Sequence, residues 1–206
     1  MKEQQAVLDF FAKIENLPLG LAVAEQLDQL RAQLNSQFWC DLQQQLAQLN
    51  GQHDLPWQLV KTEDRNVPDS QVGLHAVPTE TQHNYLHPML EQQNLGGGMR
   101  IYLGLMWRTA PTPEQLSLPA VLTLKATLQQ QGYKDNERFL AWQWTKFHPR
   151  RRDFLLRYTQ DASSLLDDLT QLYTQLALTH CEAIAQANHA LAALPRSMMV
   201  SFKGRT

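Results

Sequence analysis

The stretch Met99-Arg-Ile-Tyr-Leu-Gly-Leu-Met-Trp107 decides the fold class of this chain. It is dominated by apolar and aromatic residues over the length of a typical strand, so we predict a largely buried β-strand there. Two shorter β-like segments, 57–62 and 72–77, precede it, and the turn-rich stretch 64–70 separates them. Strands this short, without a regular helix between each pair, favour an antiparallel or mixed sheet.

Helices are predicted on both sides of these strands. Before the sheet, apolar residues recur at steps of three and four, which predicts one long helix over 19–50. A short helix over 3–15 precedes it. A proline in the first turn opens a further helix over 117–131, and a leucine-rich stripe predicts a last long helix over 161–195.

The regions between those helices are less regular. Residues 79–98 are expected to be irregular, with a helical turn around Met89. Strands are expected at 138–144 and 153–159. The prediction is therefore an α+β fold, in which an antiparallel or mixed sheet of about five short strands packs against long N- and C-terminal helices.

Length and composition suit a globular protein with one core. With 206 residues, 43% of them hydrophobic, the chain fits a single domain over 1–195, whose first 18 residues form a helical extension. Residues 196–206 are expected to be a flexible tail. A net charge of −2 gives the whole protein no attraction for nucleic acid, so any such binding has to be local.

The compartment follows from segments that the sequence lacks. The start, Met1-Lys-Glu-Gln-Gln5, has no apolar core of a signal peptide, and no apolar run approaches the roughly 20 residues of a membrane span. Cys40 and Cys181 belong to no CxxC pair, so we expect buried free thiols. The expectation is a cytoplasmic protein that does not contact membranes.

Basic and aromatic side chains gather between Phe139 and Tyr158. From Lys146 to Arg157 the chain holds five Lys or Arg residues and one Asp, a local charge of +4 (five minus one) on an acidic background. Arginines bind phosphates and exposed tryptophans stack on bases, so this segment is typical of a nucleic-acid-binding surface. The candidate binding residues are Lys146, His148, Arg150, Arg151, Arg152, Arg157, Trp142 and Trp144.

Two other interpretations of this segment stay open. Alternation along a strand would place Trp142 and Trp144 on one face, which also suits two core residues. The arginines would then form a solvated turn or pair with Asp153 and Glu137. In the other interpretation, the segment contacts a protein partner.

The sequence shows no catalytic, metal or cofactor motif. Pro68-Asp69 matches the start of a PD-(D/E)xK nuclease site, but no lysine has an acid two residues before it, so a turn is expected there. No GxSxG nucleophile motif is present. A spatially assembled hydrolase site would have to use His75, His83, His87 and Asp69. His83 and His87 are four residues apart, but Pro88 follows and no cysteine is near, so surface histidines are favoured over a zinc site.

Two short segments resemble a known group of proteins. Gln37-Phe-Trp-Cys-Asp-Leu42 in the long helix and Ile101-Tyr-Leu-Gly-Leu105 in the central strand resemble the C-terminal half of bacterial PD-(D/E)xK-nuclease-related proteins. In that group a catalytic domain precedes a helix with a Phe-Trp pair and short strands with a Tyr-x-Gly core strand. Here the catalytic half would precede Met1, so no catalytic residue is carried over. The resemblance implies an accessory or specificity domain in nucleic-acid metabolism or phage defence.

These observations together predict a bacterial binding domain without catalysis. It would contact nucleic acid through residues 146–157, in phage defence or DNA processing. The alternative is a protein-binding adaptor or inhibitor in the conflict between phage and host, which would use exposed apolar and glutamine-rich helix faces. A homo-oligomer is compatible with either function.

Overall fold

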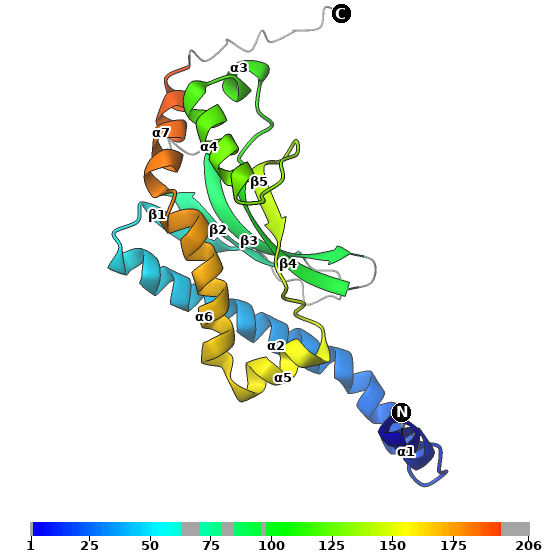
Figure 1. Ribbon diagram of the computed structural model, residues 1–206. Coiled ribbons are helices and arrows are strands. Elements are labelled where there is room, and N and C mark those ends of the chain that lie inside the picture. Colours follow the sequence, from blue (N-terminus) through cyan, green and yellow to red (C-terminus); the bar gives the residue numbers. More distant parts are fainter. Residues whose placement is uncertain (1, 63–70, 80–84, 96–97, 195–206) are drawn as a thin grey trace, which may run out of the picture.

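A five-stranded antiparallel sheet forms the centre of the protein, as the computed structural model shows for residues 2–62, 71–79, 85–95 and 98–194 (Figure 1). Each strand pairs with the next one in the sequence, which makes the sheet a meander. The predicted α+β class is therefore confirmed. The strands are β1 (Trp57–Lys61), β2 (Gly73–Pro78), β3 (Leu86–Leu95), β4 (Gly98–Trp107) and β5 (Phe139–Trp144).

Helices pack on one face of this sheet and build the main core with it. Phe38, Trp39 and Leu42 of the long N-terminal helix are fully buried there, together with Leu103 and Leu105 of β4. The helices are α1 (Lys2–Phe11), α2 (Leu17–Gln52), α3 (Pro113–Leu116), α4 (Pro119–Gln130), α5 (Arg152–Gln160), α6 (Ala162–Tyr173) and α7 (Cys181–Ala192), with a π-helical segment, Thr174–Leu178, between the last two. None of the helices in the described ranges has the length and apolar character that a membrane span requires.

Only the second half of α2 belongs to the body of the protein. Its buried residues begin at Asn35, and the preceding half projects away from the sheet (Figure 1). A short turn joins helix α1 to the free end of this projecting half, and the ring of Phe11 lies against Gly20 (Figure 1). A Cβ atom at Gly20 would come within 2.9 Å of that ring, so glycine allows the two helices to approach closely.

Two of the predicted segments are different in the structure. Residues 86–95, expected to be irregular around Met89, form β3 and pair with β4 along its whole length. This strand buries two consecutive polar residues, Glu91 and Gln92. Its sequence therefore lacks the alternation of polar and apolar residues from which a strand is predicted. Residues 153–159, expected to be a strand, lie in helix α5, whose buried Phe154 and Tyr158 are four residues apart, as on one side of a helix.

The predicted last helix is interrupted near His180. The chain leaves helical geometry at His180 (φ −107°, ψ 13°), and α7 starts at the next residue. His180 is buried, and its Nε2 lies 3.1 Å from Gln131 Oε1. Asp161 caps α6 by accepting a hydrogen bond from the Ser164 N–H.

The two cysteines lie in less buried places than the sequence predicted. Cys40 and Cys181 are free, as predicted, but Cys40 is exposed and Cys181 is half-buried. The expectation that both are buried was wrong because Cys40 lies beside the buried face of α2. The tail predicted over 196–206 lies outside the described residues.

Candidate functional site

The second face of the sheet carries its own group of large side chains, which we call the aromatic face. Alternation along β4 explains it: Ile101, Leu103 and Leu105 point into the main core, whereas Tyr102 and Met106 lie on the other side. No residue of a described helix belongs to this second cluster. The aromatic face consists of Met89, Tyr102, Met106, Phe139, Trp142 and Trp144.

The two tryptophans of β5 lie side by side on this face. Their ring centroids are 5.8 Å apart with the planes nearly perpendicular, and Trp144 makes a similar edge contact with Tyr102 at 5.3 Å. The predicted placement of both on one face is thus correct, but they lie outside the main core and are only half-buried. Rings held edge to face in this way are rigid, so their exposed surfaces are available without a large loss of conformational entropy.

Gly104 makes room for these rings. It pairs with Trp142 across β4 and β5, and a Cβ atom there would lie 3.0 Å from the Trp142 Cβ and 2.7 Å from the Ala141 carbonyl oxygen. The absence of a side chain at Gly104 therefore allows the β5 aromatics to pack closely over β4.

Positive charge meets the aromatic face at Trp144. The Arg100 guanidinium lies 5.5 Å from the centre of the Trp144 ring, and its Nε donates a hydrogen bond of 2.7 Å to the Thr145 carbonyl oxygen. Burial lowers the pKa of His148, and the nearby charges of Arg151 and Arg100 lower it further. The Arg151 backbone N–H donates a hydrogen bond of 2.9 Å to the His148 carbonyl oxygen, so the two residues are neighbours. A basic group therefore borders the tryptophans.

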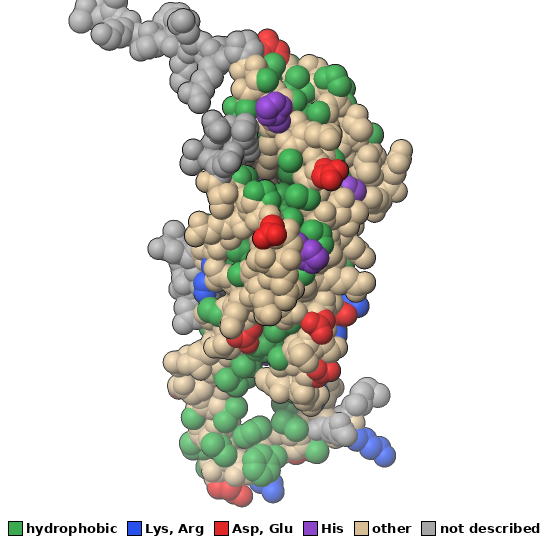
Figure 2. Space-filling view, turned by 90° about the vertical axis from the view of Figure 1, so that its left-hand side faces the viewer, with side chains coloured by type: hydrophobic (Ala, Val, Ile, Leu, Met, Phe, Trp, Pro, Cys, Tyr) green, Lys and Arg blue, Asp and Glu red, His purple; other side chains and the backbone are tan. Residues whose placement is uncertain are grey.

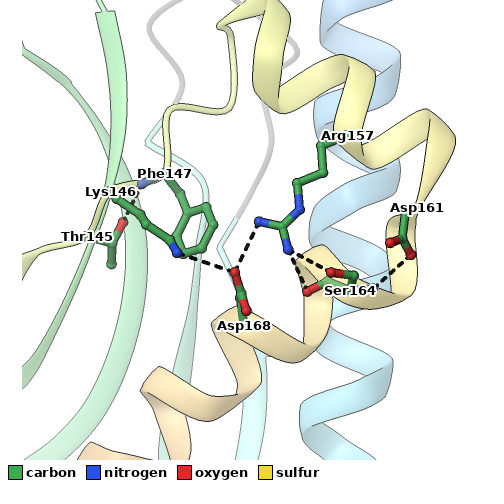
Figure 3. A network of polar contacts seen from close by, with 7 residues as sticks. All are labelled: Thr145, Lys146, Phe147, Arg157, Asp161, Ser164 and Asp168. Carbon is green, nitrogen blue, oxygen red and sulfur yellow. Dashed lines mark hydrogen bonds and ion pairs between the residues drawn. The ribbon is translucent and has the colours of Figure 1, made fainter.

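The other predicted basic residues have partners in the protein. Lys146 Nζ and Arg157 Nη1 both approach Asp168 Oδ2, at 3.5 Å and 3.1 Å, and Arg157 also donates to the Ser164 hydroxyl and carbonyl oxygens (Figure 3). The hydrogen bond from Arg157 is the main cause that lowers the pKa of Asp168. These contacts join α5 and the segment after β5 to α6. Lys146 stays largely exposed, so it also remains accessible from solvent.

The arginines at the start of α5 lie at the surface. Arg151 and Arg152 are exposed and Arg150 is half-buried. In the described part of the chain, neither Arg151 nor Arg152 forms an ion pair with Asp153 or Glu137, which was one of the alternatives.

A cavity of about 330 Å³ opens beside Trp144. Gln143, Lys146, Asp168 and Gln171 contribute polar groups to its wall. Leu103 and Leu172 of the main core also line it, so the cavity lies on the helix-covered side of the sheet, between the edge strand β5 and α6. The size and lining suit a flat polar ring such as a nucleobase, which needs an apolar surface and a few hydrogen-bonding groups.

No family model matches the chain, and searches of curated proteins and of solved structures also find no match. The functional assignment therefore rests on the chemistry of the site.

A buried polar cluster lies on the β2–β4 side of the same face. Tyr102 donates a 2.5 Å hydrogen bond to Glu91, and Glu91 Oε2 lies 3.6 Å from His75 Nε2. His75 Nδ1 lies in turn 3.3 Å from His87 Nε2. Burial is the main cause that lowers the pKa of His87 to about 4, with smaller contributions from His75 and Arg108, so this imidazole is neutral at pH 7.

This cluster contains half of the histidine site that the sequence suggested for a hydrolase. The structure brings His75 and His87 together, whereas His83 and Asp69 lie outside the described residues. The facing ring nitrogens bond each other and do not converge on one point. Within the described ranges, no group of three or more His, Cys, Asp or Glu residues is arranged to hold a metal ion.

Arg100 was not among the residues that the sequence predicted for the basic group. Arg100 is far from the basic segment in sequence, and only the pairing of β4 with β5 brings it to Trp144. The sequence does indicate that Arg100 and Tyr102 share a face of the sheet, because they are two residues apart on a predicted strand. It does not give the register between the strands, so it could not show that this face also carries the tryptophans.

Proposed function

We propose that the protein is a non-catalytic domain that binds single-stranded nucleic acid on its aromatic face. Trp142 and Trp144 would stack on unpaired bases, and Arg100 and Arg151 would bind the phosphates beside them. The observation that carries this proposal is the Arg100 guanidinium over the Trp144 ring, on a sheet face to which no described helix contributes a side chain.

The physical chemistry favours an unpaired strand over a duplex. A base can stack on a tryptophan only when it has left its own partner, and each such contact is worth roughly 1–3 kcal/mol. Because the whole protein carries a net charge of −2, attraction to phosphate must come from the local basic group.

The cellular setting is proposed from the resemblance alone. The Gln37–Leu42 and Ile101–Leu105 segments resemble PD-(D/E)xK-nuclease-related proteins, in which an accessory domain serves nucleic-acid metabolism or phage defence. A domain that holds a single strand without cutting it is compatible with that setting.

Binding can be tested with labelled single-stranded and double-stranded DNA and RNA over a series of salt concentrations. The test variant is Arg151→Ala with Arg152→Ala. The control is Lys13→Ala with Arg31→Ala, which removes the same charge from the turn after α1 and from α2. We expect salt-sensitive binding to single strands that the test variant loses and the control retains. Failure of the folded wild-type protein to bind any of the four probes at low salt would overturn the proposal.

A Trp144→Leu variant separates stacking from charge. It leaves every arginine in place, so it should weaken binding with little change in the salt dependence. Quenching of tryptophan fluorescence by the bound strand should also decrease in this variant. Unchanged affinity and quenching would show that the aromatic face does not contact the nucleic acid.

A further inference from the structure

Most of the exposed apolar surface of the protein lies at its N-terminal end. We call residues 2–31 the N-terminal hairpin; it comprises α1, the turn after it and the projecting half of α2. Of the fourteen exposed large hydrophobic residues in the described part of the chain, ten lie between Val7 and Leu30. Figure 2 shows hydrophobic side chains gathered at the lower end of the molecule, where Figure 1 places this hairpin.

Four of these residues form a stripe along α2. Leu19, Val23, Leu27 and Leu30 follow one another at steps of four, four and three, and they are 40–56% exposed. The stripe continues into Leu34, which packs against the main core, and then into the fully buried Phe38. One side of α2 is therefore apolar along most of its length, but the protein covers only the second half of it. A helix with such a side normally buries it against another element.

We propose that a second copy of this chain covers the N-terminal hairpin, so that the protein is a homodimer. The exposed fractions of the ten side chains correspond to an apolar area on the order of 900 Å² per copy, of which the stripe supplies roughly a third. An interface with the ~800 Å² per partner of a standard protein complex therefore has to include α1 as well as the stripe. A two-fold interface also uses the same surface on both subunits, so one hairpin supplies everything that the dimer needs.

The charges of the hairpin favour an identical partner. Glutamines at positions 26 and 33 border one side of the stripe, and the stripe itself holds no charged residue, so two copies facing each other bring uncharged side chains together along it. Asp28 and Arg31 pair with each other at 3.2 Å, away from the middle of the stripe. Facing glutamine amides can in turn donate and accept hydrogen bonds across the two-fold axis.

The oligomeric state of the whole chain tests this proposal. Sedimentation velocity should give twice the 23.6 kDa of one chain over a wide concentration range. The variant Val23→Glu with Leu27→Glu should sediment as a monomer at every concentration, with an unchanged circular dichroism spectrum. The control, Leu122→Glu with Leu156→Glu, places the same charges at exposed leucines of the body and should remain a dimer.

Each other outcome contradicts the proposal. If the wild-type chain is monomeric at all concentrations, a second copy does not cover the hairpin, and its apolar surface would have to bind a different protein. If Val23→Glu with Leu27→Glu still forms a dimer, the dimer interface lies on another surface. If the glutamate variant failed to fold, Leu27→Gln would replace it, because glutamine already occupies the neighbouring helix positions. That variant should weaken the dimer measurably and keep the helix.

Discussion

His87, in the polar cluster beside the aromatic face, is buried with one of its ring nitrogens lacking a hydrogen bond. His87 is almost completely buried and is hydrogen-bonded through Nε2, while its Nδ1 has no hydrogen-bond partner. An imidazole in such a place cannot take up a proton without charging a site that water does not reach. The cluster thus makes the folded protein sensitive to acid.

We predict that His87→Gln reduces the loss of stability in acid. The pKa of His87 lies at about 4 in the folded protein against 6.5 in an unfolded chain, so the unfolded chain binds the proton first as the pH falls. The stability that the neutral histidine provides is therefore present above pH 6.5 and is lost towards pH 4, by about 3 kcal/mol at most. Urea unfolding at both ends of this range measures the loss in each protein. The exposed His53→Gln variant is the control and should lose as much stability as the wild type.

Gly104→Ala should destabilise the protein by about 1–3 kcal/mol, because the added Cβ would lie 2.7 Å from the Ala141 carbonyl oxygen of a neighbouring strand. Gly51→Ala is the matched change at a helical glycine with no atom within 4 Å of the new Cβ, and it should be neutral or stabilise by up to about 1 kcal/mol. Thermal unfolding compares the two. Equal effects would show that the contact of Gly104 with β5 is unimportant.

Helices and strands whose apolar residues follow a regular spacing could be predicted from the sequence. Elements whose buried polar residues are satisfied by a neighbouring strand could not. The ladder of α2 and the strand β5 followed from the sequence because their apolar residues keep helical and strand spacing. Strand β3 could not be predicted, since its buried Glu91 accepts a hydrogen bond from Tyr102 of the neighbouring strand and the sequence does not show that pairing.

For the candidate site, the two tryptophans and Arg151 could be identified in advance, whereas Arg100 depended on the register of β4 with β5.

Helix α6 carries a negative charge next to the proposed binding surface. Asp168 forms ion pairs with Lys146 and Arg157 and lines the cavity between β5 and α6. We predict that Asp168→Asn binds a labelled single strand severalfold more tightly at low salt, because it removes a negative charge and frees two positive ones. Fluorescence anisotropy measures the change.

The neighbouring Asp167→Asn is the control for this charge. It changes the net charge equally, but Asp167 accepts a hydrogen bond from Gln45 and does not line the cavity. Its affinity should stay near that of the wild type. If both variants gained affinity equally, the effect would come from net charge and not from the site.

For the whole molecule, a dimer through the N-terminal hairpin would carry two aromatic faces. Two sites on one particle bind a long strand more tightly than each site binds a short one, because the second contact forms within the complex. We therefore predict that affinity increases with oligonucleotide length beyond one site in the wild type and levels off in the Val23→Glu, Leu27→Glu variant. Anisotropy titrations with a ladder of lengths measure this. An equal increase in both proteins would mean that the two sites do not act together.

The meander order of the sheet also has a kinetic consequence. Strands β3 and β4 pair through ten residue pairs, from Leu86 with Trp107 to Leu95 with Gly98, and these partners are close in the sequence. Closing so short a loop costs little entropy, and proteins rich in local contacts fold fast. The β3–β4 pair is therefore the natural nucleus for the rest of the sheet. Changes within it should slow folding, whereas changes in the N-terminal hairpin should leave the folding rate almost unaltered.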